Sequence, residues 1–244
     1  MKKPSATLKL SSPLIAILTT AFLLSCSGSS TNFEGLRRDM IESQIKARGL
    51  NNDDILQAMS SVPREIFVME KFKAHAYDDN EVPISNHDSL NRPFEDAAML
   101  DALDLKSSDR VMEVGTGTGY FASLLSKLAG EVFTIEIEPP LAERARKILP
   151  KLGIRNVKVV TGDGFLGLPE HAPYDAIVMQ CSPPQVPEPL VEQLKEGGRL
   201  LAPIGGGEKF QELTLFVKKD GKLSTEKRLS PANFTPMRGI ILEK

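Results

Sequence analysis

Three glycines at alternate positions, Gly115, Gly117 and Gly119, stand between an apolar run and a segment with helical spacing. Because glycine has no side chain, such a loop turns sharply and approaches a ligand closely, and the amides that open the next helix face a negative group. About twenty residues after the first glycine, Glu136 is placed to accept hydrogen bonds from both ribose hydroxyls of a nucleoside. Asp163 follows between two glycines, where it either accepts from an adenine amino group or only forms an Asx turn. The pattern predicts a binding site for a nucleoside with an anionic tail.

The glycine spacing separates two classes of nucleoside ligand. A dinucleotide fingerprint has glycine at its first, third and sixth positions, whereas the sixth position here is Tyr120. Preceded by the acidic Glu113, the loop resembles motif I of class I methyltransferases, which implies S-adenosylmethionine as the cofactor, with the carboxylate of its methionine half at the loop. The residues predicted to contact the cofactor are Glu113, Val114, Gly115, Thr116, Gly117, Gly119, Glu136, Asp163 and Gly164.

These residues need elements that hold them together. Apolar runs with strand character alternate with segments of helical period from residue 110 onward. Such an order implies right-handed crossovers, and therefore an α/β fold with a doubly wound, mostly parallel, Rossmann-like sheet. A helical N-terminal extension and a C-terminal antiparallel hairpin, turned at Asp220-Gly221, complete the expected fold. The predicted strands are 110–114, 131–135, 157–160, 174–179, 198–202, 212–218 and 222–228, and the predicted helices are 33–48, 53–59, 120–128, 141–152 and 186–194.

Further segments narrow the resemblance to one family. Together with the glycine loop and the carboxylates, they stand in the order found in protein-L-isoaspartate O-methyltransferases, over residues 33–239. The resemblance implies methyl transfer from S-adenosylmethionine to the α-carboxylate of L-isoaspartyl residues in damaged proteins, after which the ester closes to a succinimide that can hydrolyse to aspartate. The segments are Val-Pro-Arg-Glu-Ile-Phe-Val at 62–68, Pro-Ile at 83–84, Ser-Pro-Pro at 182–184, Gly-Gly at 197–198 and Phe-Thr-Pro at 234–236.

The stretch 85–93 departs from this family. Where the family resembles Gly-x-Gly-Gln-Thr-Ile-Ser-x-Pro, Asn91 takes the place of the active-site serine, Ser89 that of the threonine and Asp88 that of the glutamine. We expect Asn91 and Ser89 to be the catalytic residues, Asn91 donating to a carboxylate through its amide. Asp88 would repel an anionic substrate, and Arg92 could offset that charge. Two alternatives remain open: a different acceptor, or a lipid-anchored cofactor-binding module without turnover.

The N-terminus resembles a bacterial lipoprotein signal. Lys2 and Lys3 precede a short apolar stretch, 14–24, and Leu-Leu-Ser leads into Cys26, which the resemblance implies is lipidated after cleavage. The alternative is an apolar helix or a misassigned start. We expect a cell-envelope protein anchored through Cys26. The alternative is a cytoplasmic protein, because S-adenosylmethionine is a cytosolic metabolite. The predicted division is a signal peptide, 1–25, a tether, 26–32, and a methyltransferase domain, 33–244.

Composition limits the other partners. With 30 basic against 32 acidic residues, the chain has no excess positive field to attract nucleic acid. The family resemblance implies that its partners are proteins or peptides that carry L-isoaspartyl residues. The two cysteines are too far apart for a disulfide framework or a thiolate zinc site, and the three histidines lack metal-site spacing, so no metal is expected. Cys181 is expected to be a buried structural thiol rather than a nucleophile, and the chain is taken to be a monomer.

Overall fold

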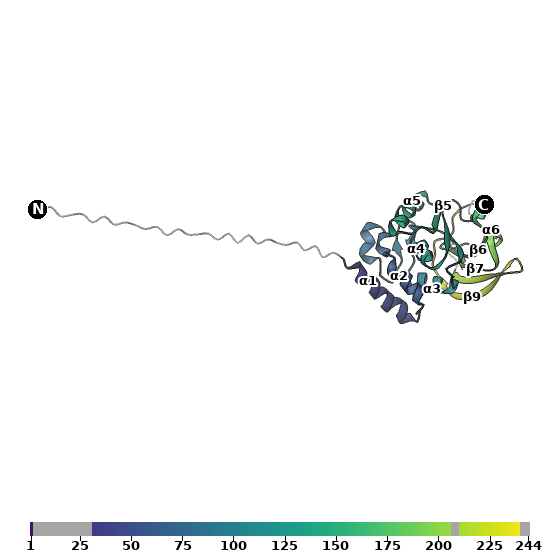
Figure 1. The fold of residues 1–244 in the computed structure, drawn as a ribbon, viewed down its shortest axis with the longest axis horizontal. Helices are drawn as coiled ribbons and strands as arrows, with labels where there is room; N and C mark the ends of the chain where they lie inside the picture. Colours follow the sequence, from purple (N-terminus) through teal and green to yellow (C-terminus); the bar gives the residue numbers. More distant parts are fainter. Residues whose placement is uncertain (2–30, 206–209, 240–244) are drawn as a thin grey trace. The chain divides into compact units, whose positions relative to one another are not determined.

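The structure is a computed structural model that describes Met1, residues 31–205 and residues 210–239 (Figure 1). The chain divides into an N-terminal unit, Met1–Thr31, and a folded unit, Asn32–Lys244. The predicted signal peptide and Cys26 lie outside the described residues. Among the residues that the structure describes, no helix is both long and apolar enough to cross a membrane.

A seven-stranded sheet forms the centre of the folded unit, in the order β5-β4-β3-β6-β7-β8-β9. The first five strands in this order run parallel, and β8 and β9 are antiparallel, which confirms the predicted α/β fold and its C-terminal hairpin. The hairpin turns at Asp220 and Gly221, whose φ angles are 53° and 75°, as a two-residue loop requires. The strands are β3 (Arg110–Val114), β4 (Glu131–Glu136), β5 (Val157–Thr161), β6 (Tyr174–Met179), β7 (Leu194–Ile204), β8 (Gln211–Lys219) and β9 (Lys222–Ala232).

Alternate residues of the inner strands supply two apolar cores, one on each face of the sheet. Val111 and Val132 belong to a core that contains Leu124 of helix α4, whereas their neighbours Met112 and Phe133 belong to the other. This period of two is the reason that the sheet is covered on both faces. The helices that follow the strands are α4 (Tyr120–Leu128), α5 (Pro139–Ile148) with η5 (Leu149–Leu152), η6 (Pro169–His171) and α6 (Glu188–Gln193).

The N-terminal extension is helical, as predicted, but not one continuous α-helix. The predicted helix 33–48 consists of α1 (Phe33–Met40), a π-helical turn η1 (Ile41–Ile45) and a 3₁₀ turn η2 (Lys46–Arg48), and it ends at Gly49, where φ is 91°. The side chain of Asn52 caps α2 (Asp53–Ser61) by accepting from two backbone amides. Figure 1 shows α2 beside α4, so the extension packs on the same face as the helix that follows the glycine loop.

Between the extension and the sheet lie elements that the sequence analysis did not predict. The helix α3 (Pro93–Leu103) begins with proline at its first turn, and the Glu95 carboxylate accepts from the Arg92 amide at 3.4 Å. Two short strands pair antiparallel and hold the turn 85–88 between them. The helix predicted at 186–194 is also shorter in the structure. It ends at Gln193, because Leu194 already belongs to β7 and pairs with Tyr174 of β6. The unpredicted elements are η3 (Arg64–Ile66), η4 (Glu70–His75), β1 (Val82–Pro83), β2 (Ser89–Leu90) and α3.

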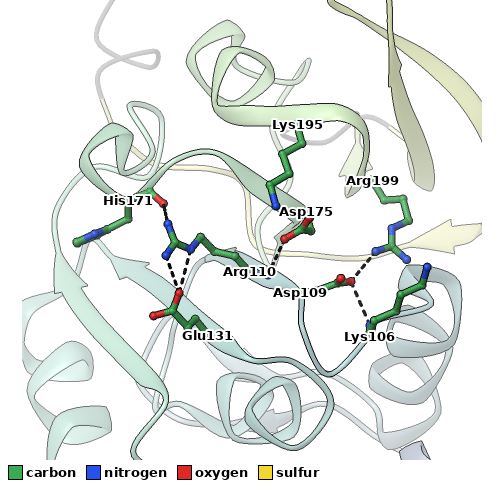
Figure 2. Close-up of polar contacts among 8 residues, drawn as sticks. All are labelled: Lys106, Asp109, Arg110, Glu131, His171, Asp175, Lys195 and Arg199. Carbon is green, nitrogen blue, oxygen red and sulfur yellow. Dashed lines mark hydrogen bonds and ion pairs between the residues drawn. The ribbon is translucent and has the colours of Figure 1, made fainter.

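Charged side chains tie the amino-terminal ends of the parallel strands together (Figure 2). The Arg110 guanidinium lies 2.6 Å from the Glu131 carboxylate, and the Arg110 amide donates to the Asp175 carboxylate at 2.8 Å. Because these polar groups are bonded to one another, this end of the sheet has a structural role. Ligands of parallel α/β sheets bind at the opposite end, beyond the carboxyl ends of the strands. Two further ion pairs at the amino-terminal ends are Lys195–Asp175 at 2.6 Å and Arg199–Asp109 at 2.7 Å.

Candidate active site

A cavity opens at the carboxyl ends of β3, β4 and β6. Its walls are the glycine loop, the residues after β4, the segment 88–91 and the segment 235–238. The structure therefore brings together seven of the nine predicted cofactor residues and both predicted catalytic residues, Asn91 and Ser89. The predicted cofactor residues that line the cavity are Glu113, Val114, Gly115, Thr116, Gly117, Glu136 and Gly164.

The glycine loop adopts backbone conformations that favour glycine. The φ angles of Gly115, Gly117 and Gly119 are 96°, 54° and 93°. A Cβ on Gly117 would lie 2.9 Å from the Ile84 side chain, whereas a Cβ on Gly119 would lie 3.2 Å from Ala145 of α5. Gly119 is not among the residues that line the cavity. Its place in the structure is the close contact between the start of α4 and α5, and its contact with a cofactor stays a prediction.

The Glu136 carboxylate is fixed at the end of β4 by two backbone amides. Its Oε2 accepts from Gly117 at 2.7 Å, and its Oε1 accepts from Glu138 at 2.9 Å. Burial raises the pKa of this carboxyl, although both amides lower it. Each oxygen keeps a lone pair, so the carboxylate is oriented to accept from the two hydroxyls of a ribose.

Glu113 supplies a second acceptor beside the loop. It is fully buried, and its Oε2 accepts from the Thr134 hydroxyl at 2.6 Å. Within the described residues, its Oε1 has no hydrogen-bond partner. Burial raises the pKa of the Glu113 carboxyl well above its usual range, and the Thr134 hydroxyl lowers it only in part. A buried acceptor without a partner fits the ammonium group of the methionine half of S-adenosylmethionine.

Asp163 occupies the predicted strand end but not the cavity wall. Its Oδ1 accepts from the Phe165 amide at 2.9 Å, which is the Asx-turn alternative of the sequence analysis. Gly164 does line the cavity, and a Cβ there would lie 2.4 Å from the Val114 side chain. The turn at Asp163 thus presents Gly164 to the cavity, and the contact of Asp163 with adenine stays a prediction.

The side chain of Asn91 is held in a way that the sequence did not indicate. Its Nδ2 donates to the Asp96 carboxylate at 2.9 Å and to Oε1 of Gln180 at 2.7 Å. A carboxamide nitrogen carries only two hydrogens, so neither is left to donate to a substrate carboxylate. This differs from the prediction that the Asn91 amide donates to that carboxylate. Ser89 is exposed and lines the cavity, and its catalytic role stays a prediction.

A buried ion pair stands behind Asn91. Arg64, from the Val-Pro-Arg-Glu segment, is 0% exposed, and its Nη1 lies 3.0 Å from the Asp96 carboxylate. The other guanidinium nitrogens donate to the backbone carbonyls of Ala76 and Asn91, and the guanidinium stacks over the Tyr120 ring. Burial raises the pKa of the Asp96 carboxyl, and the Arg64 cation opposes that shift. The family segment at 62–68 therefore serves to anchor the residue in the position of the family serine.

The charge of Asp88 is offset, but by a different residue from the one expected. Arg238 donates through Nη2 to both Asp88 oxygens, at 3.0 and 3.3 Å, and through Nη1 to Glu138 at 2.6 Å. The prediction that Arg92 plays this role is wrong, because its side chain is half exposed and pairs with Glu95. The wall that faces the substrate is therefore not left with an unpaired carboxylate at Asp88.

Backbone hydrogen bonds bring the segment 235–238 to the cavity. The Ser182 amide donates to the Thr235 carbonyl, and the Met237 amide donates to the Ser182 carbonyl, each at 2.9 Å. This explains why the Ser-Pro-Pro and Phe-Thr-Pro segments occur together. Cys181, directly before Ser182, lines the cavity, and burial raises the pKa of its thiol to about 12. The thiol is therefore protonated near neutral pH and is a poor nucleophile, as predicted.

The fold and the cavity together define a class of protein. A parallel sheet whose central strand leads into a glycine loop, with a buried carboxylate at the end of the next strand, is the architecture of an S-adenosylmethionine-dependent methyltransferase. The family of Protein-L-isoaspartate(D-aspartate) O-methyltransferases matches residues 36–240, and the chain belongs to this family.

Relatives and solved structures agree with this assignment. A Protein-L-isoaspartate O-methyltransferase from Syntrophus aciditrophicus is 48% identical over 174 residues, which are 71% of this chain and 80% of the relative. Protein-L-isoaspartate O-methyltransferase 2 from an Anaeromyxobacter species is 45% identical over 83% of each chain. A solved protein-L-isoaspartate O-methyltransferase is 31% identical with a TM-score of 0.74, and the match covers 84% of this chain and 66% of that one. The Plasmodium falciparum enzyme in complex with S-adenosyl-L-homocysteine is 26% identical with a TM-score of 0.71, covering 86% and 99%.

Proposed function

We propose that this enzyme methylates the α-carboxylate of L-isoaspartyl residues in damaged proteins, with S-adenosylmethionine as the methyl donor. The observation that carries the proposal is the shared cavity, in which the glycine loop, Glu113 and Glu136 meet the acceptor-side residues around Asn91. The family supports it directly, since the relatives from Anaeromyxobacter and Syntrophus, which match over most of their length, carry the name of this activity.

The chemistry asks for alignment rather than for an acid or a base. When bound, S-adenosylmethionine supplies a methyl group already activated by the sulfonium. The substrate carboxylate is ionised near neutral pH, so no proton has to be removed before its oxygen bonds to the methyl carbon. The residues of the chain then have to hold both groups in line and exclude water. Glu113 and Glu136 hold the cofactor, and the wall around Asn91 positions the acceptor.

One observation favours a second candidate function, a different acceptor. Both amide hydrogens of Asn91 are engaged by Asp96 and Gln180, so the acceptor side differs from that expected for the family serine. A module that binds the cofactor without turnover is the third candidate.

The purified chain separates these candidates in two steps. Titration with S-adenosylhomocysteine, followed calorimetrically, tests the cofactor half, and we expect saturable binding. Methyl transfer is then measured with an isoaspartyl peptide and with the same peptide containing normal aspartate, and only the first should be methylated. Saturable binding with no transfer to either peptide would contradict the isoaspartyl assignment. No binding in folded protein would contradict the methyltransferase assignment as a whole.

The lipid anchor, the location and the monomeric state are parts of the same proposal. Its support is the Leu-Leu-Ser-Cys sequence ending at Cys26, and the proposed location is the cell envelope. In a bacterial host, labelled fatty acid should enter the wild-type chain and not the Cys26→Ala variant. An unlabelled wild-type chain in the cytoplasmic fraction would instead support the cytoplasmic alternative. Light scattering of the purified protein tests for the monomer.

A further inference from the structure

Gln180 lines the cavity, and its side-chain amide nitrogen has no hydrogen-bond partner among the described residues. It follows β6 directly, and its own backbone amide donates to the Val114 carbonyl at 2.8 Å, next to the glycine loop. A Cβ on Gly115 would lie 3.2 Å from the Cβ of Gln180, so the side chain packs closely on the loop. Its Nε2 is buried, and no described residue accepts a hydrogen bond from it. A buried donor of this kind calls for an acceptor from a ligand.

The direction of that donor is fixed by a chain of hydrogen bonds that begins at Arg64. The guanidinium is permanently charged, so Asp96 opposite it is a carboxylate, which can only accept. Asn91 must then turn its nitrogen toward Asp96, and the second hydrogen of that nitrogen reaches Gln180. Gln180 must therefore present its oxygen to Asn91, which leaves its nitrogen without an acceptor among the described residues. The assignment of nitrogen and oxygen in both amides thus follows from the buried ion pair.

We propose that Nε2 of Gln180 donates to the α-carboxylate of the isoaspartyl substrate, and that Gln180 thereby selects an anionic acceptor. This inference rests on the proposed function and names a donor for its substrate. A carboxylate only accepts, so it matches a site that offers a hydrogen and rejects one that offers an oxygen. The Gln180 oxygen accepts a hydrogen bond from Asn91, which polarises the Gln180 amide and strengthens Nε2 as a donor. Asn91, in the position of the family serine, acts through Gln180 as a positioning residue.

The test uses the full chain saturated with S-adenosylhomocysteine, so that binding is measured without turnover. Two fluorescent peptides are compared: one with an L-isoaspartyl residue and one in which its α-carboxylate is a carboxamide. The variants are Gln180→Met, which removes the donor, and Gln180→Glu, which replaces it with a charged acceptor. Gln57→Glu, on the exposed face of α2, is the matched control for the change of charge.

We expect Gln180→Met to weaken the binding of the isoaspartyl peptide by about 10- to 100-fold, the range for a lost hydrogen bond to a charged group. The carboxamide peptide should change little, so the preference for the carboxylate disappears, and Gln180→Glu should bind the isoaspartyl peptide more weakly still. Affinity for S-adenosylhomocysteine should stay within about twofold in both variants, which also shows that they fold. Gln57→Glu should match the wild type.

Two results would overturn the inference. If Gln180→Met keeps the preference for the carboxylate, Gln180 does not contact that group. If affinity for S-adenosylhomocysteine falls as far as affinity for the peptide, Nε2 serves the cofactor tail instead. Both results are distinct from failure of the proposed function, which would appear in the wild-type chain as binding without methyl transfer.

Discussion

Replacing Asp96 by asparagine should reverse the polarity of the cavity without changing its shape. The oxygen of the new amide must face the Arg64 guanidinium, so its nitrogen faces Asn91. Asn91 then turns its oxygen toward residue 96 and accepts from Gln180, which in turn presents its own oxygen to the cavity. A donor for the substrate carboxylate becomes an acceptor, although the substitution is made two hydrogen bonds away along the chain from Asp96 to Gln180.

The same substitution has a cost in stability that can be worked from the contacts. Arg64 and Asp96 are 0% and 2% exposed, and removing one charge of a buried pair costs about 3–5 kcal/mol. Asp96→Asn keeps the hydrogen bonds, so we expect the lower end, about 3 kcal/mol. For a domain of this size that corresponds to a fall of about 6–12 °C in Tm. With a total stability of about 5–15 kcal/mol, the variant should remain folded at 25 °C.

Thermal unfolding and initial rates with an isoaspartyl peptide, both on purified protein, test the two effects. We expect the KM for the peptide to rise about tenfold or more, with the affinity for S-adenosylhomocysteine unchanged, and Tm to fall as stated. A variant with the expected loss of Tm but an unchanged KM would refute the relay from Arg64 to the cavity. A variant with unchanged Tm would refute the burial of an ionised pair.

Three further changes test separate parts of the site. Arg238→Gln leaves Asp88 unpaired, so the KM for an anionic peptide should rise about twofold to fivefold at low salt. The rise should be smaller at high salt, because salt screens the charge of Asp88. An unchanged KM at low salt would count against the pairing. Burial raises the folded-state pKa of Glu113, so the protonated carboxyl stabilises the fold fully below the ordinary glutamate value of 4.5. This stabilisation is lost as pH rises through the raised pKa. The free energy of unfolding of Glu113→Gln, measured in urea across this range, should not show that loss. Gly164→Ala should cost about 1–3 kcal/mol by collision with Val114. Made in a Val114→Ala background, the same change should cost much less if the collision is the cause.

The parts of the fold that could be predicted are those written locally in the sequence. Strand β3 and the glycine loop after it are contiguous, and the alternation of Val111 and Met112 between two cores is a property of neighbouring residues. The hairpin turn at Asp220-Gly221 is likewise decided by two residues that tolerate positive φ. Glu136 could be placed for the same reason, because a strand end is located by counting from the loop.

The acceptor side could not be predicted because its pairings join distant residues. Arg64 is 32 residues from Asp96, and Asn91 is 89 residues from Gln180, so no local pattern marks either partner. Asp88 was correctly recognised as a charge that needs an offset, but the nearest cation in sequence, Arg92, points elsewhere, and Arg238 is 150 residues away. Helix α3 was missed although its opening proline and the Glu95 contact are local signals that sequence reasoning could have used.

The great sequence separation of these pairings has a consequence for how the enzyme forms and fails. The ion pair of Asp88 with Arg238 closes a loop of 150 residues, which costs more chain entropy than the adjacent strand pairings of the hairpin. We therefore expect this wall to assemble late in folding and to open first on warming, ahead of the sheet. An enzyme that counters protein ageing would then lose its own activity before its secondary structure melts.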